Sequence, residues 1–231
     1  MGRYLRAWGW TCKRPAKRWT QQDPARVKAW IEQQYPAIAA SAQAEGARIL
    51  WADEMGLRAG QTAGTSYAPV GERAVTPVTG KRFSVNVISA IGNDGTLLFD
   101  VFEGYGDEIR FMDFCDKLIA HHAGRKVFLI VDNHSIHKSA AVALWQEDHP
   151  ELELFFLPPY APEVNPDEYL NNDVHAHVAR RRPSTLGELT EMAAEIFADR
   201  LHAEADAEDR QLLRKRAHAA HVLFARHRMD H

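Results

Sequence analysis

Three acidic residues, Asp53, Asp132 and Glu168, stand where carboxylates can do chemistry. Asp53 follows the short apolar run Ile49–Trp51, Asp132 ends the apolar run "RKVFLIVDN", and Glu168 comes just after an Asn-Pro step. A buried carboxylate is costly unless it is paired or binds a metal, and hard divalent cations prefer oxygen ligands. If the three acids converge, they predict a site for two Mg²⁺ or Mn²⁺ ions. Such a pair of ions can activate an attacking oxygen and stabilise a leaving one in phosphodiester chemistry.

Each acid also has a purely structural explanation. An Asp at the end of a strand is often a turn or capping residue. Glu54 competes with Asp53 for the first position, because neighbouring side chains of a strand point to opposite faces and only one of the two can face a shared site. The residue types and spacing alone leave these alternatives open.

Asp167 and Glu168 pose a similar choice. Asn165 and Pro166 are suited to the N-cap and the first position of a helix, which places the two acids in its first turn. Both acids would favour a helix N-terminus without doing any chemistry. At 100° per residue, Asp167 lies closer to the apolar stripe of this helix than Glu168 does. The stripe comprises Leu170, Val174 and Val178. Spacing does not choose between the two acids.

Histidines raise the alternative of a zinc site, through two closely spaced pairs: His134 and His137, and His175 and His177. Their spacings match metal sites only loosely, and no cysteine supports them. His137 is an alternative contact for the reacting part of a substrate. The carboxylates therefore remain the predicted metal ligands.

The elements that must position these acids follow a regular order along the chain. Three β-rich runs come first, then a helix, a strand, a helix, a strand and a further helix from Pro166 to about Arg180. A hairpin signal, "GNDG", separates the second and third strands. This order predicts an α/β protein with a mixed sheet flanked by helices. In open sheets of this kind, ligands bind beyond the carboxyl ends of the strands.

Composition excludes several classes of protein. At 231 residues and 45% hydrophobic, the chain can bury one full-sized core with extensions. Its two cysteines, Cys12 and Cys115, form no CxxC pair, which argues against a disulfide framework and fits a reducing cytoplasm. No apolar run approaches the roughly 18 residues of a membrane span, and nothing indicates an export signal.

Charge is distributed unevenly although the formal net charge is only −3. Residues 1–30 hold eight basic residues against one acidic residue. Basic ends on an acidic body are typical of segments that bind a polyanion, although a basic run can also be a solvated helix face. The candidate DNA-binding residues are Arg3, Arg6, Lys13, Arg14, Lys17 and Arg18. Trp8, Trp10 and Trp19 could pack or stack, and we expect core packing for each.

Three motifs carry a resemblance to a known family. The segments "ILWADEMGLR", "VDNHSIHKS" and "LPPYAPEVNPDEYLNND" resemble, in this order, the three catalytic motifs of DDE transposases. The match is to the bacterial insertion-sequence branch of the mariner-like superfamily. The 35 residues between Asp132 and Glu168 are similar to the short spacing of that family. In place of "NND", many relatives have a Trp.

The resemblance implies an RNase H-like fold and a catalytic triad of Asp53, Asp132 and Glu168 that binds two Mg²⁺ or Mn²⁺ ions. It leaves Asp167 as an acid of the helix start. It further implies hydrolysis at the ends of an insertion sequence, strand transfer into target DNA, double-stranded DNA as the partner, a homodimer, and a cytoplasmic protein that is nucleoid-associated when bound to DNA. A nuclease without strand transfer, and a catalytically silent DNA-binding or regulatory remnant, are the alternatives.

The predicted domain organisation has three parts. Residues 1–45 form a basic helical remnant of a DNA-binding region with its linker, 46–202 the catalytic domain, and 203–231 a helical C-terminal tail. The resemblance implies a helix-turn-helix region ahead of the catalytic domain, of which "GRYLRAWGW" resembles only the last helix. We therefore expect this region to be truncated.

Overall fold

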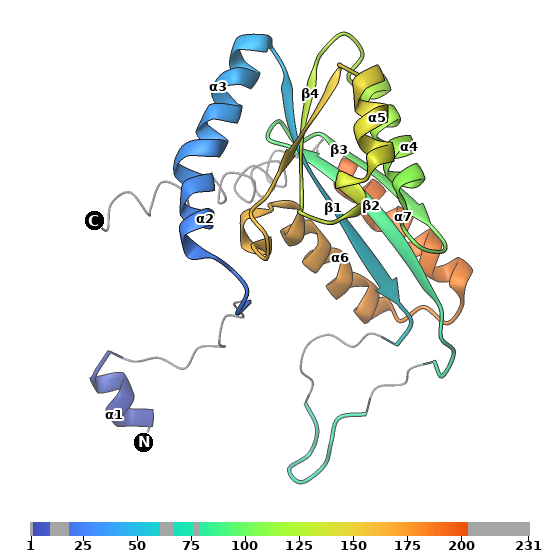
Figure 1. Cartoon of the computed structure of the whole chain (residues 1–231). Helices are drawn as coiled ribbons and strands as arrows, with labels where there is room; N and C mark the ends of the chain where they lie inside the picture. The colour runs from blue at the N-terminus through green and yellow to red at the C-terminus, as the bar shows by residue number, and fades with distance from the viewer. Residues whose placement is uncertain (1, 10–18, 61–66, 76–78, 203–231) are drawn as a thin grey trace.

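A five-stranded mixed sheet forms the centre of the molecule (Figure 1). The computed structural model describes residues 2–9, 19–60, 67–75 and 79–202. The strand order is β3-β2-β1-β4-β5, with antiparallel pairing from β3 to β1 and parallel pairing from β1 to β5. The strands are β1 (Arg48–Arg58), β2 (Ser84–Gly92), β3 (Leu97–Phe102), β4 (Val127–Val131) and β5 (Leu152–Phe156). The predicted mixed, RNase H-like sheet is confirmed.

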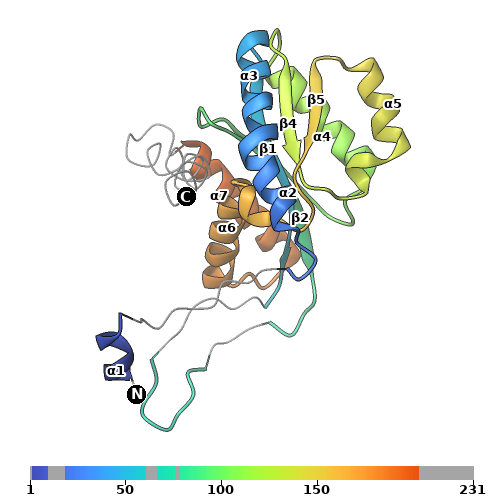
Figure 2. The ribbon, with the colours of Figure 1, turned by 60° about the vertical axis from the view of Figure 1, so that its left-hand side comes forward.

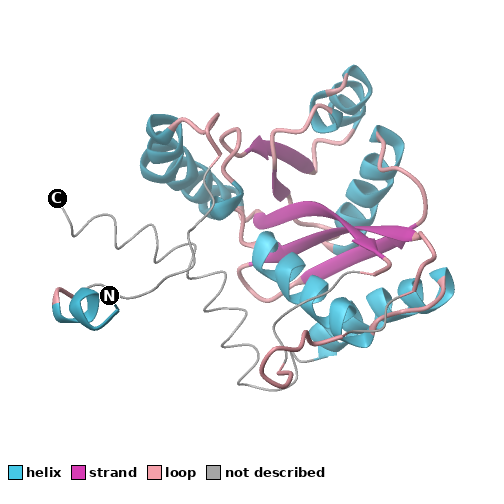
Figure 3. Ribbon diagram, turned by 90° about the horizontal axis from the view of Figure 1, so that it is seen from below, coloured by secondary structure: helices cyan, strands magenta, loops and turns pink. Residues whose placement is uncertain are grey.

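Helices lie on both sides of this sheet (Figure 3). The α-helices are α1 (Gly2–Ala7), α2 (Pro24–Ala29), α3 (Tyr35–Glu45), α4 (Glu108–His121), α5 (Ala140–Asp148), α6 (Asp167–Arg181) and α7 (Leu186–His202). Three short elements join them: the π-helical turn η1 (Trp30–Gln34) and the 3-10 turns η2 (Ile136–Lys138) and η3 (Pro162–Val164). The order of strands and helices from β1 to α6 is the predicted one.

The first long helical segment is continuous rather than broken before Pro36. Asp23 caps it, accepting a hydrogen bond from the backbone N–H of Ala25 at 2.9 Å, as its position before Pro24 predicts. Helix α3 is joined to α2 through η1, in which the Tyr35 N–H donates to the Trp30 carbonyl. The wider π turn lets the helix pass a proline, which supplies no N–H of its own.

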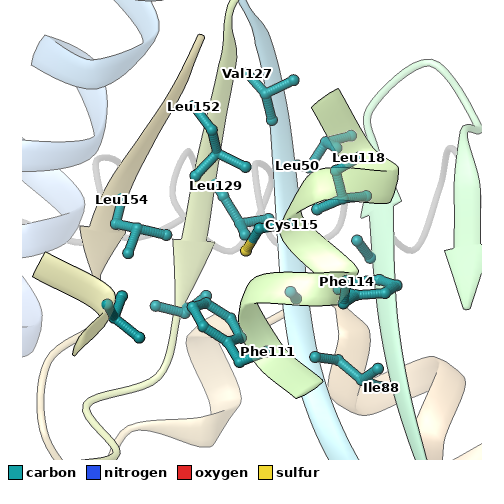
Figure 4. Packing of buried hydrophobic residues seen from close by; sticks show 14 residues of the cluster. Leu50, Ile88, Phe111, Phe114, Cys115, Leu118, Val127, Leu129, Leu152 and Leu154 are labelled. Atoms are coloured by element: carbon teal, nitrogen blue, oxygen red, sulfur yellow. The ribbon is translucent and has the colours of Figure 1, made fainter. Parts of the chain in front are cut away.

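One face of the sheet is covered by α4 and α5. Figure 4 shows the side chains packed there. The sheet supplies alternate residues of β1, β2, β4 and β5, and the helices supply mainly large apolar side chains of α4. The labelled members are Leu50, Ile88, Phe111, Phe114, Cys115, Leu118, Val127, Leu129, Leu152 and Leu154. Cys115 is a buried free thiol, and burial raises its pKa far above the ordinary value.

The other face is covered by two groups of helices. Helices α6 and α7 pack on β1, β2 and β3, with Leu170, Val174 and Val178 all buried, as the apolar stripe predicts. The segment from α2 to α3 packs near β1 and β4, and Figure 2 brings it forward. There Trp30 is buried against Trp51, with ring centroids 5.7 Å apart.

We expected Asp53 to follow a strand, but it lies within β1. Strand β2 pairs with β1 from Leu50 to Arg58, whereas β4 pairs with it only as far as Trp51. Antiparallel pairing with β2 therefore continues β1 beyond the point where its parallel pairing with β4 ends. Asp53 consequently sits where β1 still has a neighbour on its β2 side and has none in β4.

Parts of the predicted organisation lie outside the described residues. These are the tail from 203 to 231 and the linker from 10 to 18. The domain boundaries therefore stay predictions, although α3 ends at Glu45 and β1 begins at Arg48. Within the described part of the chain, none of the helices combines the length and apolar character needed to cross a bilayer.

Candidate active site

One pocket brings the three predicted acids together. Its volume is about 610 Å³, and it opens beside the carboxyl ends of β4 and β5. Asp53 comes from β1, Asp132 follows β4 directly, and Glu168 lies in the first turn of α6. The other lining residues are Trp19, Asn133, His134, Ser135, Leu157, Pro158, Pro159, Tyr160, Ala161, Pro162 and Asn165.

Parallel pairing of β1 with β4 explains why the two aspartates meet. The last residue pair of this ladder joins Trp51 to Ile130, and each aspartate lies two residues further along its own segment. Side chains two residues apart on a strand share a face. Trp51 and Ile130 belong to one cluster on the α2–α3 side, and Asp53 lies on that side of β1.

Asp53 is held by two hydrogen bonds. Its Oδ2 accepts from Asn171 Nδ2 at 3.0 Å, and its Oδ1 accepts from the Glu54 backbone N–H at 2.9 Å. Burial, and then the negative charge of Glu168, raise the pKa of Asp53 to about 7. The Asp53 carboxyl is therefore close to half protonated at neutral pH when no cation balances the charge around it.

Asp132 has the opposite electrostatic character. Its Oδ1 accepts from the His134 backbone N–H at 2.9 Å and lies 3.1 Å from His137 Nδ1. Burial alone would raise the pKa of Asp132, but the hydrogen bonds from His137 and His134 outweigh it, so the pKa lies below its ordinary value. Asp132 is thus the one acid of the three whose surroundings favour its ionised form.

His137 is buried behind Asp132. Its ring packs on Phe111 at 4.4 Å between centroids, and its Nε2 lies 3.8 Å from Glu54 Oε1. Burial would lower the pKa of His137, but Asp132 and Glu54 together raise it to about 9. A protonated His137 therefore bridges the two carboxylates. It contacts Asp132 and is not among the residues that line the pocket as described.

Glu168 is positioned through Asn165, which ties the start of α6 to β1. Asn165 Nδ2 donates to the Ala52 carbonyl at 3.3 Å, and Asn165 Oδ1 accepts from the Asp167 N–H at 3.1 Å. The helix begins one residue later than predicted, because η3 precedes it and Pro166 occupies the cap position. Burial, followed by the charge of Asp132, raises the pKa of Glu168.

Asp167 is more than the helix-start acid that we expected. It is fully buried, and its Oδ2 accepts from Ser89 Oγ at 2.8 Å. Burial, and then the charge of Asp53, raise the pKa of Asp167 well above its ordinary value. Within the described residues, Asp167 Oδ1 and Asn171 Oδ1 are buried and have no hydrogen-bond partner. The neutral form of this carboxyl, which lies behind the pocket, is therefore favoured.

The structure distinguishes Asp53 from its neighbour Glu54, and Glu168 from its neighbour Asp167. Asp53 and Glu168 line the pocket with Asp132, whereas Glu54 and Asp167 are not among its lining residues as described. Glu54 points to the α4 side of the sheet, where it meets His137. The catalytic roles of Asp53, Asp132 and Glu168 stay predictions, but the three share a pocket.

The donor set suits a hard divalent cation in its chemistry. Three carboxylates surround the pocket, and their mutual repulsion contributes to the raised pKa values of Asp53 and Glu168. Across the part of the chain that the structure describes, no group of three or more His, Cys, Asp or Glu side chains is arranged to hold a metal ion. Metal binding would require these carboxylates to turn toward a common centre.

The predicted DNA-binding residues are placed only in part. Arg6 is exposed on α1, the backbone of Arg3 belongs to the same helix, and Lys13, Arg14, Lys17 and Arg18 lie outside the described residues. The expectation of core packing is wrong for Trp8 and Trp19, which are 70% and 58% exposed, and Trp10 is not described. Trp19 instead lines the pocket.

Several polar residues of the site escaped prediction. Asn171, Asn165 and Ser89 each hold an acid or its segment in place. Asn171 lies four residues after Asp167, so the same helical wheel would have placed it beside that acid. Ser89 comes from β2, 78 positions before Asp167, and carries no local signal of its role.

Solved structures of Mos1, described as a mariner transposase, share this fold. The Mos1 mariner paired end complex with Mn superposes with a TM-score of 0.70 at 16% identity, covering 97% of this chain and 67% of that one. The Mos1 strand transfer complex gives 0.68 at 18% identity, covering 97% and 66%. The catalytic domain of Mos1 mariner transposase gives 0.55 at 14% identity, covering 93% and 98%. The chain thus spans about two thirds of the first two proteins. No match was found among curated protein sequences.

The fold and the acids around its pocket define a class, the RNase H-like proteins with carboxylates at the sheet edge. A sequence model described as DDE superfamily endonuclease matches residues 48–190, which is more than half of the chain, and a winged helix-turn-helix model matches residues 1–34. The chain therefore belongs to the DDE superfamily endonucleases. The resemblance inferred from the three motifs is confirmed at the level of this family.

Proposed function

We propose that this protein is a DNA transposase that hydrolyses phosphodiesters at insertion-sequence ends and then joins the freed ends to target DNA. The observation that carries the proposal is the pocket in which Asp53, Asp132 and Glu168 meet. The family of endonucleases to which residues 48–190 belong supports phosphodiester hydrolysis. The likeness to the Mos1 strand transfer complex supports the joining step.

Asp53, Asp132 and Glu168 would hold two Mg²⁺ or Mn²⁺ ions. When bound, these ions would activate the attacking oxygen and neutralise charge on the leaving oxygen. The chain's own residues prepare the site for them. His137 and His134 keep Asp132 ionised, Asn171 fixes the orientation of Asp53, and Asn165 anchors the segment that carries Glu168 to β1.

Double-stranded DNA is the proposed partner. The winged helix-turn-helix match over residues 1–34 coincides with the basic segment that holds Arg3, Arg6 and the four basic residues from Lys13 to Arg18. These side chains would contact phosphates, which position a protein on DNA without reading its sequence. By analogy with the paired-end complexes of Mos1, we propose a homodimer. We further propose a cytoplasmic protein that associates with the nucleoid through its DNA.

Purified full-length protein tests the proposal with supercoiled plasmid DNA. Wild-type protein should nick the plasmid with Mg²⁺ or Mn²⁺ and not with EDTA, and Asp132→Ala and Glu168→Gln should abolish nicking. Asp167→Asn should retain a larger share of activity than Glu168→Gln, because Asp167 lies behind the pocket and does not line it as described. The matched control is Glu147→Gln, an exposed acid on α5. Full nicking by Asp132→Ala would refute the assignment.

A second assay separates a transposase from the two alternatives. Pre-cut DNA ends taken from the sequence that flanks the coding region are offered together with a target plasmid. Joined products support strand transfer. Nicking without joining would identify a nuclease, and DNA binding with neither reaction would identify a silent regulatory protein.

A further inference from the structure

Two exposed aromatic rings stand at the pocket that holds the acids. Trp19 is 58% exposed and Tyr160 is 53% exposed, and their ring centroids lie 6.4 Å apart with planes inclined by 44°. Both residues line the pocket together with Asp53, Asp132 and Glu168. The apolar core does not account for either ring, so their place beside the acids calls for a functional explanation.

The loop that carries Tyr160 is held firmly in an unfavourable conformation. Tyr160 has φ of +57°, a left-handed conformation that costs energy for a bulky side chain. Prolines at 158, 159 and 162 restrict the same loop. Strain of this kind persists only where the surroundings enforce it, and here it keeps the Tyr160 ring at the pocket.

The segment that carries Trp19 is tied to that loop. Gln22 Nε2 donates to the Tyr160 carbonyl at 3.0 Å and also to Glu163 Oε1. Trp19 and Tyr160 are 141 positions apart in sequence, yet one side chain three residues after Trp19 fixes their segments together. The rings are thus pre-positioned, which reduces the entropy lost when a flat ligand binds between or upon them.

The chemistry of the pocket indicates what the rings would bind. A DNA strand whose phosphate is processed at the acids would pass within the same pocket of about 610 Å³. A paired base shows only its edge to a protein, whereas an unpaired base can lay its face on an aromatic ring. Flat apolar faces beside a site for a phosphate match a nucleotide, with its apolar base and charged backbone. An acidic peptide would meet three carboxylates and neither lysine nor arginine among the lining residues as described.

We propose that Trp19 and Tyr160 form a stacking site for an unpaired base of the DNA strand that is cut at Asp53, Asp132 and Glu168. The proposal rests on the proposed function, because it takes the strand at the acids to be DNA. It adds a requirement that the acids alone do not impose, namely that the duplex be opened by at least one base beside the scissile phosphate.

The test uses the full-length protein and a DNA duplex that ends in three unpaired nucleotides, one of them 2-aminopurine. Affinity is measured by anisotropy in Ca²⁺ buffer, and stacking by quenching of the 2-aminopurine fluorescence. Trp19→Ala and Tyr160→Asn should each weaken binding about 10-fold, the order expected for one stacked base, and should remove the quenching. Asn tolerates the left-handed conformation, so Tyr160→Asn removes the ring without adding strain.

Three controls sharpen the result. Tyr160→Phe keeps a ring and should bind and quench as the wild type does. Tyr105→Ala removes a tyrosine that is 94% exposed and does not line the pocket as described, and should change neither quantity. DNA with an abasic site in place of each unpaired base should bind the wild type about 10-fold more weakly and should not weaken further with Trp19→Ala.

The outcomes separate this proposal from the proposed function. Wild-type protein that nicks DNA with Mg²⁺ but binds abasic and base-bearing DNA equally would overturn the stacking site and leave the nuclease intact. Quenching that depends on Trp19 and Tyr160 without any nicking or joining would support the stacking site and overturn the transposase. If the variants change only the sedimentation of the protein, a second copy of the chain is the occupant and the stacking site is refuted.

Discussion

The two faces of the sheet are built on different principles. Under α4 and α5, the buried cluster consists of apolar side chains and one thiol, Cys115, with the buried ring of His137 packed on Phe111 at its edge. Under α6, the apolar cluster continues toward α7, but beside it Ser89, Asp167 and Asn171 are buried as well. Two buried oxygen atoms of that polar group, on Asp167 and Asn171, have no partner among the described residues.

This difference shows how the fold tolerates a site whose buried polar groups are destabilising. Buried polar groups that lack partners cost roughly 1–3 kcal/mol each, and buried carboxyls shift their pKa values rather than stay charged. The apolar packing on both faces offsets that cost, so the polar group can be held beside the pocket without relaxing. The packing under α4 and α5 stabilises the fold. The buried polar groups under α6 lower that stability while they hold the acids in place.

The largest expected effect is a test of the apolar packing itself. Phe114→Ala removes a buried ring of α4 and should lower the free energy of unfolding by about 3–5 kcal/mol, since a cavity is left in a packed core. Urea unfolding measures it. Phe197→Ala, which removes the buried ring stacked on Phe99 at 4.8 Å, should cost a similar amount. A much smaller cost for Phe197→Ala would mean that the α7 side is loosely packed and that the two faces differ in more than their polar groups.

An intermediate effect tests the charge at the pocket. The pKa of Asp53 is raised from 3.8 to about 7, so between about pH 4 and pH 7 the folded chain holds a proton that the unfolded chain releases, and stability falls as pH rises. Asp53→Asn cannot titrate. Without metal, it should therefore be more stable than the wild type by about 1–3 kcal/mol at pH 8 and equal to it near pH 4.

Urea unfolding in EDTA at the two pH values measures this difference. Comparing the variant with the wild type cancels the titration of groups that both proteins share. Adding Mg²⁺ at pH 8 should stabilise the wild type more than Asp53→Asn, because a ligand that binds only the folded state stabilises it. A difference between the proteins that does not change with pH would show that Asp53 has an ordinary pKa.

The smallest expected effect concerns the polar group behind the pocket. Ser89→Ala removes the hydroxyl that donates to Asp167 and should cost about 1 kcal/mol, the usual net value of one hydrogen bond. Ser84→Ala, at the exposed start of the same strand, should stay within about 0.5 kcal/mol of the wild type. Equal values for the two serines would indicate that Asp167 finds another donor.

The features that could be predicted from the sequence are those set by the local pattern of apolar and polar residues. The alternation of strands and helices from β1 to α6 and the apolar stripe of α6 follow from hydrophobic periodicity, which the chain shows clearly. The proximity of Asp53 to Asp132 follows from the parallel pairing of β1 with β4, which ends two residues before each aspartate. The helical wheel also placed Asp167 near the apolar side, although it did not show that the residue is fully buried.

The rest depends on contacts between distant segments. Asp53 lies inside β1 because β2 prolongs the strand, and that pairing is set by the register and not by the residues around Asp53. The exposure of Trp19 depends on where Gln22 binds the loop at Tyr160. Long-range pairings of this kind have no periodic signature, so composition and spacing led us to expect a core position for Trp19.

The way in which α6 is attached to β1 also affects when the protein can act. Asn171 is 118 positions from Asp53, and Asn165 is 113 positions from Ala52. A chain that has left the ribosome only as far as β5 holds Asp53 and Asp132 but neither Glu168 nor the amides that arrange the start of α6. Under the proposed function, a newly made chain would therefore be unable to cut DNA until α6 has been synthesised and has docked on β1.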